Sequence, residues 1–174
     1  MQNTYSDLSY ITSLPSTFLL SPFNFQSTDQ SALHRARKTA KFLLKKNPSS
    51  LRLYNAYGLI EAKAENLSVS DHVFSTALSM SKNLPENSQR DSILLWHTWT
   101  WDALWRSDKE TAMHRLLCIG ESKMTARPAP GWRISDCTPA AILKARAVCL
   151  AFINSILLNH KSYHDILSHF LVIC

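Results

Sequence analysis

The stretch NPSSLRLYNAYGLIE, residues 47–61, decides the fold that this sequence predicts. It opens on an Asn-Pro break and then carries aromatic and small side chains at helical spacing. A second segment, which contains Phe74 and Ala77, carries the matching residues further along the chain. Small Gly58 and Ala77 would let two helices touch, while Tyr54 and Phe74 would fill the space around them. The pattern predicts a pair of packed antiparallel helices, and its defining residues are Tyr54, Tyr57, Gly58, Ser70, Phe74 and Ala77.

The same pattern recurs along the chain. A 34-residue step towards the N-terminus from Ser70, Phe74 and Ala77 reaches Ala36, Ala40 and Leu43. A 42-residue step towards the C-terminus from the pattern reaches Trp96, Ala112, Leu116 and Ile119. An insertion in the polar stretch 81–90 explains why the second step is longer. Repeats with steps of this kind are typical of tetratricopeptide (TPR) arrays and their relatives.

The repeat predicts an all-α fold, an α-solenoid of HAT/TPR-like antiparallel helix pairs. Glu61 stands where a TPR unit usually has an aromatic residue, which favours the half-a-TPR (HAT) variant. The packing positions of the array are Tyr54, Tyr57, Gly58, Phe74, Ala77, Trp96, Trp99, Ala112 and Leu116.

Two regions are expected along the chain. Residues 1–29 form a disordered or extended N-terminal segment, and residues 30–174 form the helical-repeat domain. The domain ends on an apolar run without the polar cap that a terminal repeat needs, so we expect an array truncated at its C-terminus. Its expected parts are a helix at 31–46, helix pairs at 50–82 and 90–121, a loop at 122–137, a helix at 139–158 and a partner helix from 162 onward.

Composition excludes several classes of protein. The 174 residues are 45% apolar, enough for one packed core, and no period-two alternation predicts a sheet. The apolar run 147–158 is too short to cross a membrane, and residues 1–29 lack the features of a secretory signal. Four cysteines without a C-x-x-C spacing indicate a reduced compartment and buried small side chains rather than disulfides; they are Cys118, Cys137, Cys149 and Cys174.

The net charge of +6 comes from one segment. Residues 34–52 hold no acidic residue, whereas the remainder of the chain has 12 basic and 13 acidic residues. On a helical wheel the basic residues, with Phe42 among them, lie opposite an apolar side. This surface is either a solvated outer face or a contact surface for RNA phosphate or an acidic partner, and no base-stacking motif accompanies it. Its residues are Arg35, Arg37, Lys38, Lys41, Lys45, Lys46 and Arg52.

Four tryptophans share one expected helix. Trp96 and Trp99 lie on one side of it, and Trp101 and Trp105 lie on nearly the opposite side. We expect this helix to be buried from two directions, as an inner helix of a stacked array would be, rather than to present an aromatic cage or a base-stacking platform.

Catalytic and cofactor motifs do not occur. The chain has no nucleotide-binding P-loop, no dinucleotide-binding glycine motif and no nucleophile elbow, so we expect no catalytic residue, no cofactor and no small-molecule substrate. His160 and His164 could share a metal, but no third ligand is implied. His114 and Cys118 are spaced for one helix face and are interpreted as packing residues rather than as a nucleophile pair.

The segment 36–57, followed by LWHTWTW at 95–101, resembles the nuclear RNAi-defective (NRDE-type) family of HAT-repeat proteins. The resemblance spans roughly residues 30–121 and is most specific from Lys45 to Glu61. It implies a nuclear, non-enzymatic scaffold in RNA silencing and RNA surveillance. It also implies protein partners, namely the exosome-linked nuclear RNA helicase and splicing factors.

Two alternatives to this function stay open at the level of sequence. One is direct RNA binding through the basic helix, and the other is a splicing or polyadenylation HAT scaffold of the crooked-neck type. The two scaffold readings differ only in their partners.

Overall fold

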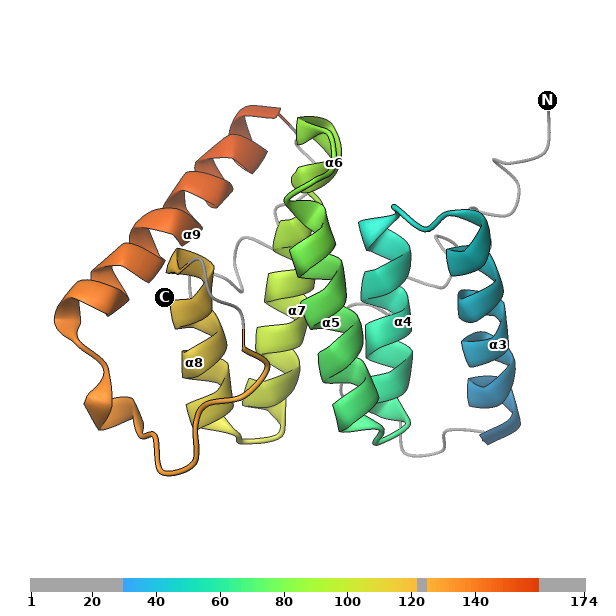
Figure 1. Cartoon of the computed structure of the whole chain (residues 1–174), viewed down its shortest axis with the longest axis horizontal. Helices are drawn as coiled ribbons and strands as arrows, with labels where there is room; N and C mark the ends of the chain where they lie inside the picture. The colour runs from blue at the N-terminus through green and yellow to red at the C-terminus, as the bar shows by residue number, and fades with distance from the viewer. Residues whose placement is uncertain (1–29, 122–124, 160–174) are drawn as a thin grey trace. The chain divides into compact units, whose positions relative to one another are not determined.

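Every element of the described structure is helical. The structure is a computed structural model that describes residues 30–121 and 125–159, and within them it contains no strand (Figure 1). The prediction of an all-α fold is confirmed for these residues. In order the elements are α3 (Gln30–Lys46), α4 (Leu51–Lys63), α5 (Leu67–Ser81), α6 (Glu86–Gln89), α7 (Ser92–Trp105), α8 (Lys109–Gly120), the 3-10 helix η2 (Ile134–Asp136) and α9 (Pro139–Asn159).

The described residues fall into two units, with the boundary between His34 and Arg35. The first turn of α3 belongs to the first unit, and every contact described below lies within the second. The expected N-terminal segment at 1–29, the expected helix from 162 onward, the pair His160 and His164, and Cys174 all lie outside the described residues. None of the helices in the described part is long and apolar enough to span a membrane.

The helix boundaries predicted from periodicity are confirmed to within about two residues. The expected helix at 31–46 is α3, the pair at 50–82 is α4 and α5, and the pair at 90–121 is α7 and α8. The helix expected at 139–158 is α9. The sequence predicts a plain polar loop after α5, but this stretch contains the four-residue helix α6. The turn begins at Pro85 and is held by the Gln89 side chain, whose Nε2 donates to the Leu84 carbonyl at 2.8 Å.

The two helix pairs end their first helix in the same way. Glu65 after α4 and Ser107 after α7 both have positive φ, 60° and 62°, and they are separated by the same 42-residue step as the sequence pattern. The residue after each donates its backbone N–H to a carbonyl five positions earlier, Asn66 to Glu61 and Asp108 to Ala103, at 3.0 Å in both cases. This is a Schellman C-cap made without glycine. The turns therefore repeat at the offset that the sequence pattern predicts.

The core forms where α4, α5 and α7 pack against one another, with α8 packed on α7 and α9 on α8 (Figure 1). Gly58 permits the closest approach, because a Cβ there would lie only 2.6 Å from the Phe74 ring. Gly120 plays a similar part between α8 and α9, where a Cβ would lie 3.3 Å from the backbone nitrogen of Ala145. The buried members of the main cluster are Leu51, Phe74, Ala77, Leu78, Leu95, Trp96, Trp99 and Cys118.

A second apolar cluster joins α3 to α4 and α5. Ala40 from α3, Tyr57 from α4 and Val73 from α5 form its buried centre, and Leu44 packs against them. Ala40 and Leu43 are the buried residues of α3, and both are positions that the 34-residue step reaches. The apolar side predicted for this helix thus contacts the helix pair that follows it.

Candidate functional site

A partly buried ion pair ties α3 to α4. The guanidinium of Arg37 donates to both carboxylate oxygens of Glu61, from Nε at 2.9 Å and from Nη2 at 2.5 Å. Asn66 also donates to Glu61, from Nδ2 at 3.0 Å, and the Tyr57 hydroxyl bonds the same carboxylate. Glu61, which marks the departure from a TPR unit, is therefore a buried structural residue.

The hydrogen bonds at Glu61 set its ionisation. Burial by itself would raise the pKa of this carboxyl, but the bonds from Arg37, Tyr57 and Asn66 outweigh burial and lower the pKa. The same contact raises the pKa of Tyr57 to about 12, through burial first and then through the hydrogen bond to Glu61. The carboxylate is thus held in its charged form inside the helix interface.

A second buried carboxylate, Asp71 on α5, ties together α5, α7, α8 and the segment after α8. Its Oδ1 accepts from Trp99 Nε1 at 2.9 Å and from Arg115 Nη2 at 2.6 Å. Its Oδ2 accepts from Nε of Arg127 at 2.9 Å. Arg115 lies 4.4 Å from the ring centroid of Trp99 and also donates to the Trp99 carbonyl. This is a satisfied polar network within the helix interface.

Arg115 is only 1% exposed, and burial lowers the pKa of its guanidinium to about 10 despite the opposing effect of Asp71. A buried cation of this kind needs its carboxylate, because an unpaired charge in the interior is strongly destabilising. The sequence patterns do not single out Asp71 or Arg115. The signal that could have found them is an acid and a base at positions that helical periodicity assigns to the buried side.

The predicted basic surface divides into two groups. Arg37 is engaged with Glu61 in the interface, and Arg52 donates to Asp91 at 2.9 Å and 3.1 Å on the exposed side of α4. The other five basic residues are exposed on α3, and together with Phe42 we call them the basic face: Arg35, Lys38, Lys41, Lys45 and Lys46.

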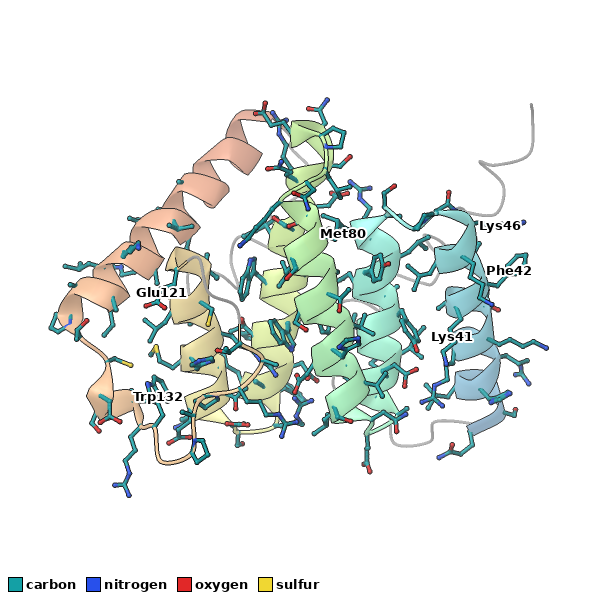
Figure 2. The ribbon with its side chains drawn as sticks, in the orientation of Figure 1. Lys41, Phe42, Lys46, Met80, Glu121 and Trp132 are labelled. Carbon is teal, nitrogen blue, oxygen red and sulfur yellow. The ribbon has the colours of Figure 1, made fainter. Side chains whose placement is uncertain are left out.

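Phe42 lies in the middle of the basic face and is 55% exposed. The Lys46 Nζ lies 4.5 Å from the centroid of its ring, and Figure 2 shows both side chains on the side of α3 turned away from α4. Lys41 points towards α4, where its Nζ lies 5.8 Å from the centroid of the Tyr57 ring. The basic face therefore combines exposed cations with one exposed aromatic ring.

The prediction for the tryptophan helix is half wrong. Trp96 and Trp99 are buried in the main core, but Trp101 is only partly buried and Trp105 is 44% exposed. The reason is tertiary: α4, α5 and α8 pack against α7, and this packing buries Trp96 and Trp99 more fully than Trp101 and Trp105. The side of the helix that carries Trp101 and Trp105 is thus less buried than predicted.

On this side α7, α8 and η2 line an apolar groove, which we call the tryptophan groove. Its volume is about 440 Å³. Lys109 is the one charged residue in its lining. The lining residues are Trp101, Leu104, Trp105, Lys109, Ala112, Met113, Leu116 and, from η2, Ile134.

The predicted packing positions lie in or against the two apolar clusters or in the wall of the groove. Phe74, Ala77, Trp96 and Trp99 are buried in the main cluster, and Tyr54 packs partly buried against both clusters. The remaining positions are all buried as well; they are Tyr57, Gly58, Ala112 and Leu116.

The histidine and cysteine residues form no reactive pair within the described part of the chain. His114 lies 3.9 Å from the Cys118 sulfur, but burial raises the pKa of that thiol, which opposes formation of a nucleophilic thiolate. Cys118 and Cys149 are buried as predicted, whereas Cys137 is only partly buried, and none of these three is in a disulfide. Across residues 30–121 and 125–159, no cluster of three His, Cys, Asp or Glu residues could hold a metal ion.

Comparison with known proteins finds no matching family model, no matching curated protein and no matching solved structure.

Proposed function

We propose that this chain is a non-enzymatic helical-repeat scaffold that binds protein partners in nuclear RNA silencing and RNA surveillance or processing. The observation that carries the proposal is the repetition of one helix pair. The 42-residue step relates Leu67 to Lys109, the first residues of α5 and α8, and it also relates the last residues of α4 and α7, Lys63 and Trp105. Stacked pairs of this kind are typical of α-solenoids of the HAT/TPR type, whose surfaces bind partners.

The motif that defines the repeat is used for packing. Its aromatic and small residues lie in the helix interfaces, so partner binding in this scaffold falls to the surfaces that the interfaces leave open. Two such surfaces are the basic face on α3 and the tryptophan groove. The nuclear location and the partners, an exosome-linked RNA helicase and splicing factors, follow from the resemblance to NRDE-type proteins.

The test is affinity purification of the full chain from nuclear extract after nuclease treatment, which removes partners bridged by RNA. We expect RNA helicase and exosome components, with splicing factors, to be enriched over a Phe74→Asp variant whose core is disrupted. Recovery of splicing or polyadenylation factors without the helicase would instead favour a scaffold of the crooked-neck type. Recovery of none of these components would remove the proposed function.

A second candidate function is direct RNA binding through the basic face. The exposed Phe42 ring beside exposed lysines favours it, because single-stranded RNA is bound by cations that follow the phosphates and by aromatic rings that stack on bases. We expect Lys38→Glu, Lys41→Glu and Lys45→Glu together to weaken binding of a single-stranded RNA. The salt slope should fall by about 0.7 for each phosphate that the protein no longer neutralises.

The matched control reverses three exposed lysines elsewhere, Lys82, Lys109 and Lys144. It has the same net charge, so it separates a local contact from a general effect of charge. Phe42→Ala should weaken binding by about 1–3 kcal/mol and leave the salt slope unchanged. RNA affinity and salt slope that are equal in the two triple variants would eliminate direct RNA binding by this face.

A further inference from the structure

The turn between α3 and α4 exposes a serine next to the lysines of the basic face. Residues 47–50 form this turn, in which the Ser50 backbone N–H donates to the Asn47 carbonyl at 3.2 Å. A bond from the fourth residue to the first, with Pro48 at the second position, is typical of a β-turn. Ser49 stands at the third position and is exposed. Its hydroxyl group is therefore accessible from solvent.

The charge around Ser49 is positive. Lys46 precedes it by three residues and Lys45 by four, and both are exposed at the end of α3. Figure 2 labels Lys46 at this end of the helix. Residues 45–52 hold three basic residues and no acidic one, and the third base, Arg52, is already paired with Asp91. The two lysines are thus the cations that can act on a group attached to Ser49.

This pattern suits one class of modifying enzyme. Protein kinases with an acidic substrate cleft select a serine or threonine that follows basic residues, because the opposite charges attract. A turn extends into such a cleft at small cost, since few backbone hydrogen bonds have to break. Thr39 also follows basic residues, but it lies inside α3. Ser107 is exposed in the turn between α7 and α8, but no basic residue stands three or four positions before it.

We propose that Ser49 is a phosphorylation site for a basophilic protein kinase, and that its phosphate weakens RNA binding by the basic face. In the transfer, Ser49 Oγ forms a bond to the γ-phosphorus of Mg·ATP. The bond from that phosphorus to the β,γ-bridging oxygen breaks, ADP leaves, and the hydroxyl proton passes to a base of the kinase. The inference rests on the proposed binding of RNA by the basic face and names the regulation of that site.

The phosphate acts through its charge. A phosphoserine carries a charge of about −1.5 to −2 at neutral pH, and its oxygens accept charge-assisted hydrogen bonds from ammonium groups. Lys45 and Lys46, two of the five cations of the basic face, are the ones closest to Ser49 along the chain. When they pair with the phosphate of the protein, they no longer neutralise phosphates of RNA. The remaining cations of the face then bind RNA more weakly.

The first experiment tests the modification. The full chain is incubated with a basophilic serine/threonine kinase and Mg·ATP, and mass spectrometry locates the phosphate. We expect it on Ser49, so that Ser49→Ala abolishes the modification and Ser50→Ala leaves it unchanged. Lys46→Ala should lower kcat/KM of the kinase by about tenfold, because it removes the cation three residues before the acceptor. The matched control is Lys144→Ala, an exposed lysine on α9, which should leave kcat/KM unchanged.

The second experiment tests the effect on RNA. Phosphoserine is incorporated during translation at Ser49 or, as a control of equal charge outside the basic face, at Ser107. Fluorescence anisotropy with a single-stranded RNA then measures affinity at several salt concentrations. The phosphate on Ser49 should weaken binding by about tenfold near 0.1 M salt and lower the salt slope by about 1.4, which is about 0.7 for each of two RNA phosphates. The phosphate on Ser107 should change neither, and circular dichroism checks that both chains are folded.

The proposal is overturned if the kinase leaves the chain unmodified, if it modifies Ser50 or Thr39 instead, or if it modifies Ser49→Ala as fast as the wild type. Equal RNA affinities of the chains phosphorylated at Ser49 and at Ser107 would overturn the regulation. RNA binding by the unmodified chain without an effect of the phosphate would keep the RNA-binding function and remove only this inference. An unmodified chain that binds no RNA would remove that function together with its regulation, and the kinase experiment alone would then decide the phosphorylation site.

Discussion

Gly58 on α4 lies against the ring of Phe74 on α5 so closely that a Cβ at residue 58 would stand 2.6 Å from Phe74 Cε2. The contact is reinforced next to it, where the Ser70 hydroxyl donates to the Gly58 carbonyl at 2.9 Å. Phe74 is fully buried and its ring also stacks on Trp99, with centroids 5.9 Å apart. A glycine and a phenylalanine thus set the distance between two helices.

The first prediction concerns this contact. Gly58→Ala should destabilise the protein by about 1–3 kcal/mol, because the added methyl group overpacks a core whose Phe74 ring has no room to move. The gain in helix propensity, about 1 kcal/mol at most, offsets only part of that cost. Urea unfolding followed by circular dichroism measures the change.

The control for it is the double variant Gly58→Ala with Phe74→Leu. Since the smaller side chain removes the clash, the two changes together should cost less than the sum of the single changes. Strictly additive free energies would contradict the interpretation that the Phe74 ring is what excludes a Cβ at this position.

A second prediction compares two aspartates. Asp71→Ala should cost about 3–5 kcal/mol, because it leaves the buried Arg115 guanidinium without its carboxylate. Asp91→Ala removes the partner of Arg52 in an exposed ion pair and should cost about 0–1 kcal/mol. Chemical denaturation of both variants gives the comparison, and equal losses would show that burial does not decide the strength of these ion pairs.

A third prediction concerns acid stability. The folded protein lowers the pKa of Glu61. The contribution of Glu61 to the free energy of unfolding is therefore present in full above the ordinary carboxyl pKa of about 4.3, and it is lost as the pH falls through the lower pKa of the folded state. We expect Glu61→Gln to be less stable than the wild type near neutral pH and to lose less stability on acidification.

The measurement for Glu61 is the free energy of unfolding at about pH 7 and about pH 3.5 in both proteins. Asp102 acts in the opposite direction, since burial raises the pKa of its carboxyl and protonation there favours the folded state. Asp102→Asn is therefore the control, and its stability should fall more steeply with acid than that of the wild type. A variant Glu61→Gln with the same pH slope as the wild type would refute the prediction.

A fourth prediction concerns His114. Burial first, and then the nearby Arg115, lower the pKa of this imidazole, which contacts Thr125 at 3.1 Å and lies T-shaped to the Trp132 ring. Because the pKa of His114 is lower in the folded state, its contribution to the free energy of unfolding is present in full above the ordinary histidine pKa of about 6.5 and falls as the pH drops below that value. We expect His114→Gln to show a smaller loss of stability between about pH 7 and about pH 5 than the wild type. An NMR titration of the His114 ring that gave a pKa above the ordinary value would contradict this account.

The helices could be predicted from the sequence because their signals are local. The Asn-Pro break before α4, the spacing of Tyr57 and Gly58, and the small residue Ala77 all act within a few residues, and the boundaries of α4 and α5 followed from them. The short helix α6 did not follow, since a single turn started by Pro85 has no periodicity to detect. The Schellman turns at Glu65 and Ser107 were missed because neither residue is a glycine.

The candidate surfaces were predicted less well. The basic segment was found, but the pattern gave no reason to separate Arg37 and Arg52 from the exposed lysines. Their carboxylate partners, Glu61 and Asp91, stand 24 and 39 residues further along the chain. The tryptophan groove was missed, because Trp101 and Trp105 were assigned to a second buried side of α7.

The sequence by itself determined the helical fold, the helix boundaries, the spacing of the helix pairs and the excess of positive charge on α3. Each depends on residues a few positions apart, which a helix brings onto one face. The tertiary structure alone decided which arginines pair with buried carboxylates and which tryptophans of α7 are buried. A helical wheel ranks the sides of one helix by polarity, but the covering of a side depends on whether another helix reaches it. On α7 that question was decided by the packing of α4, α5 and α8, which left Trp105 at the surface.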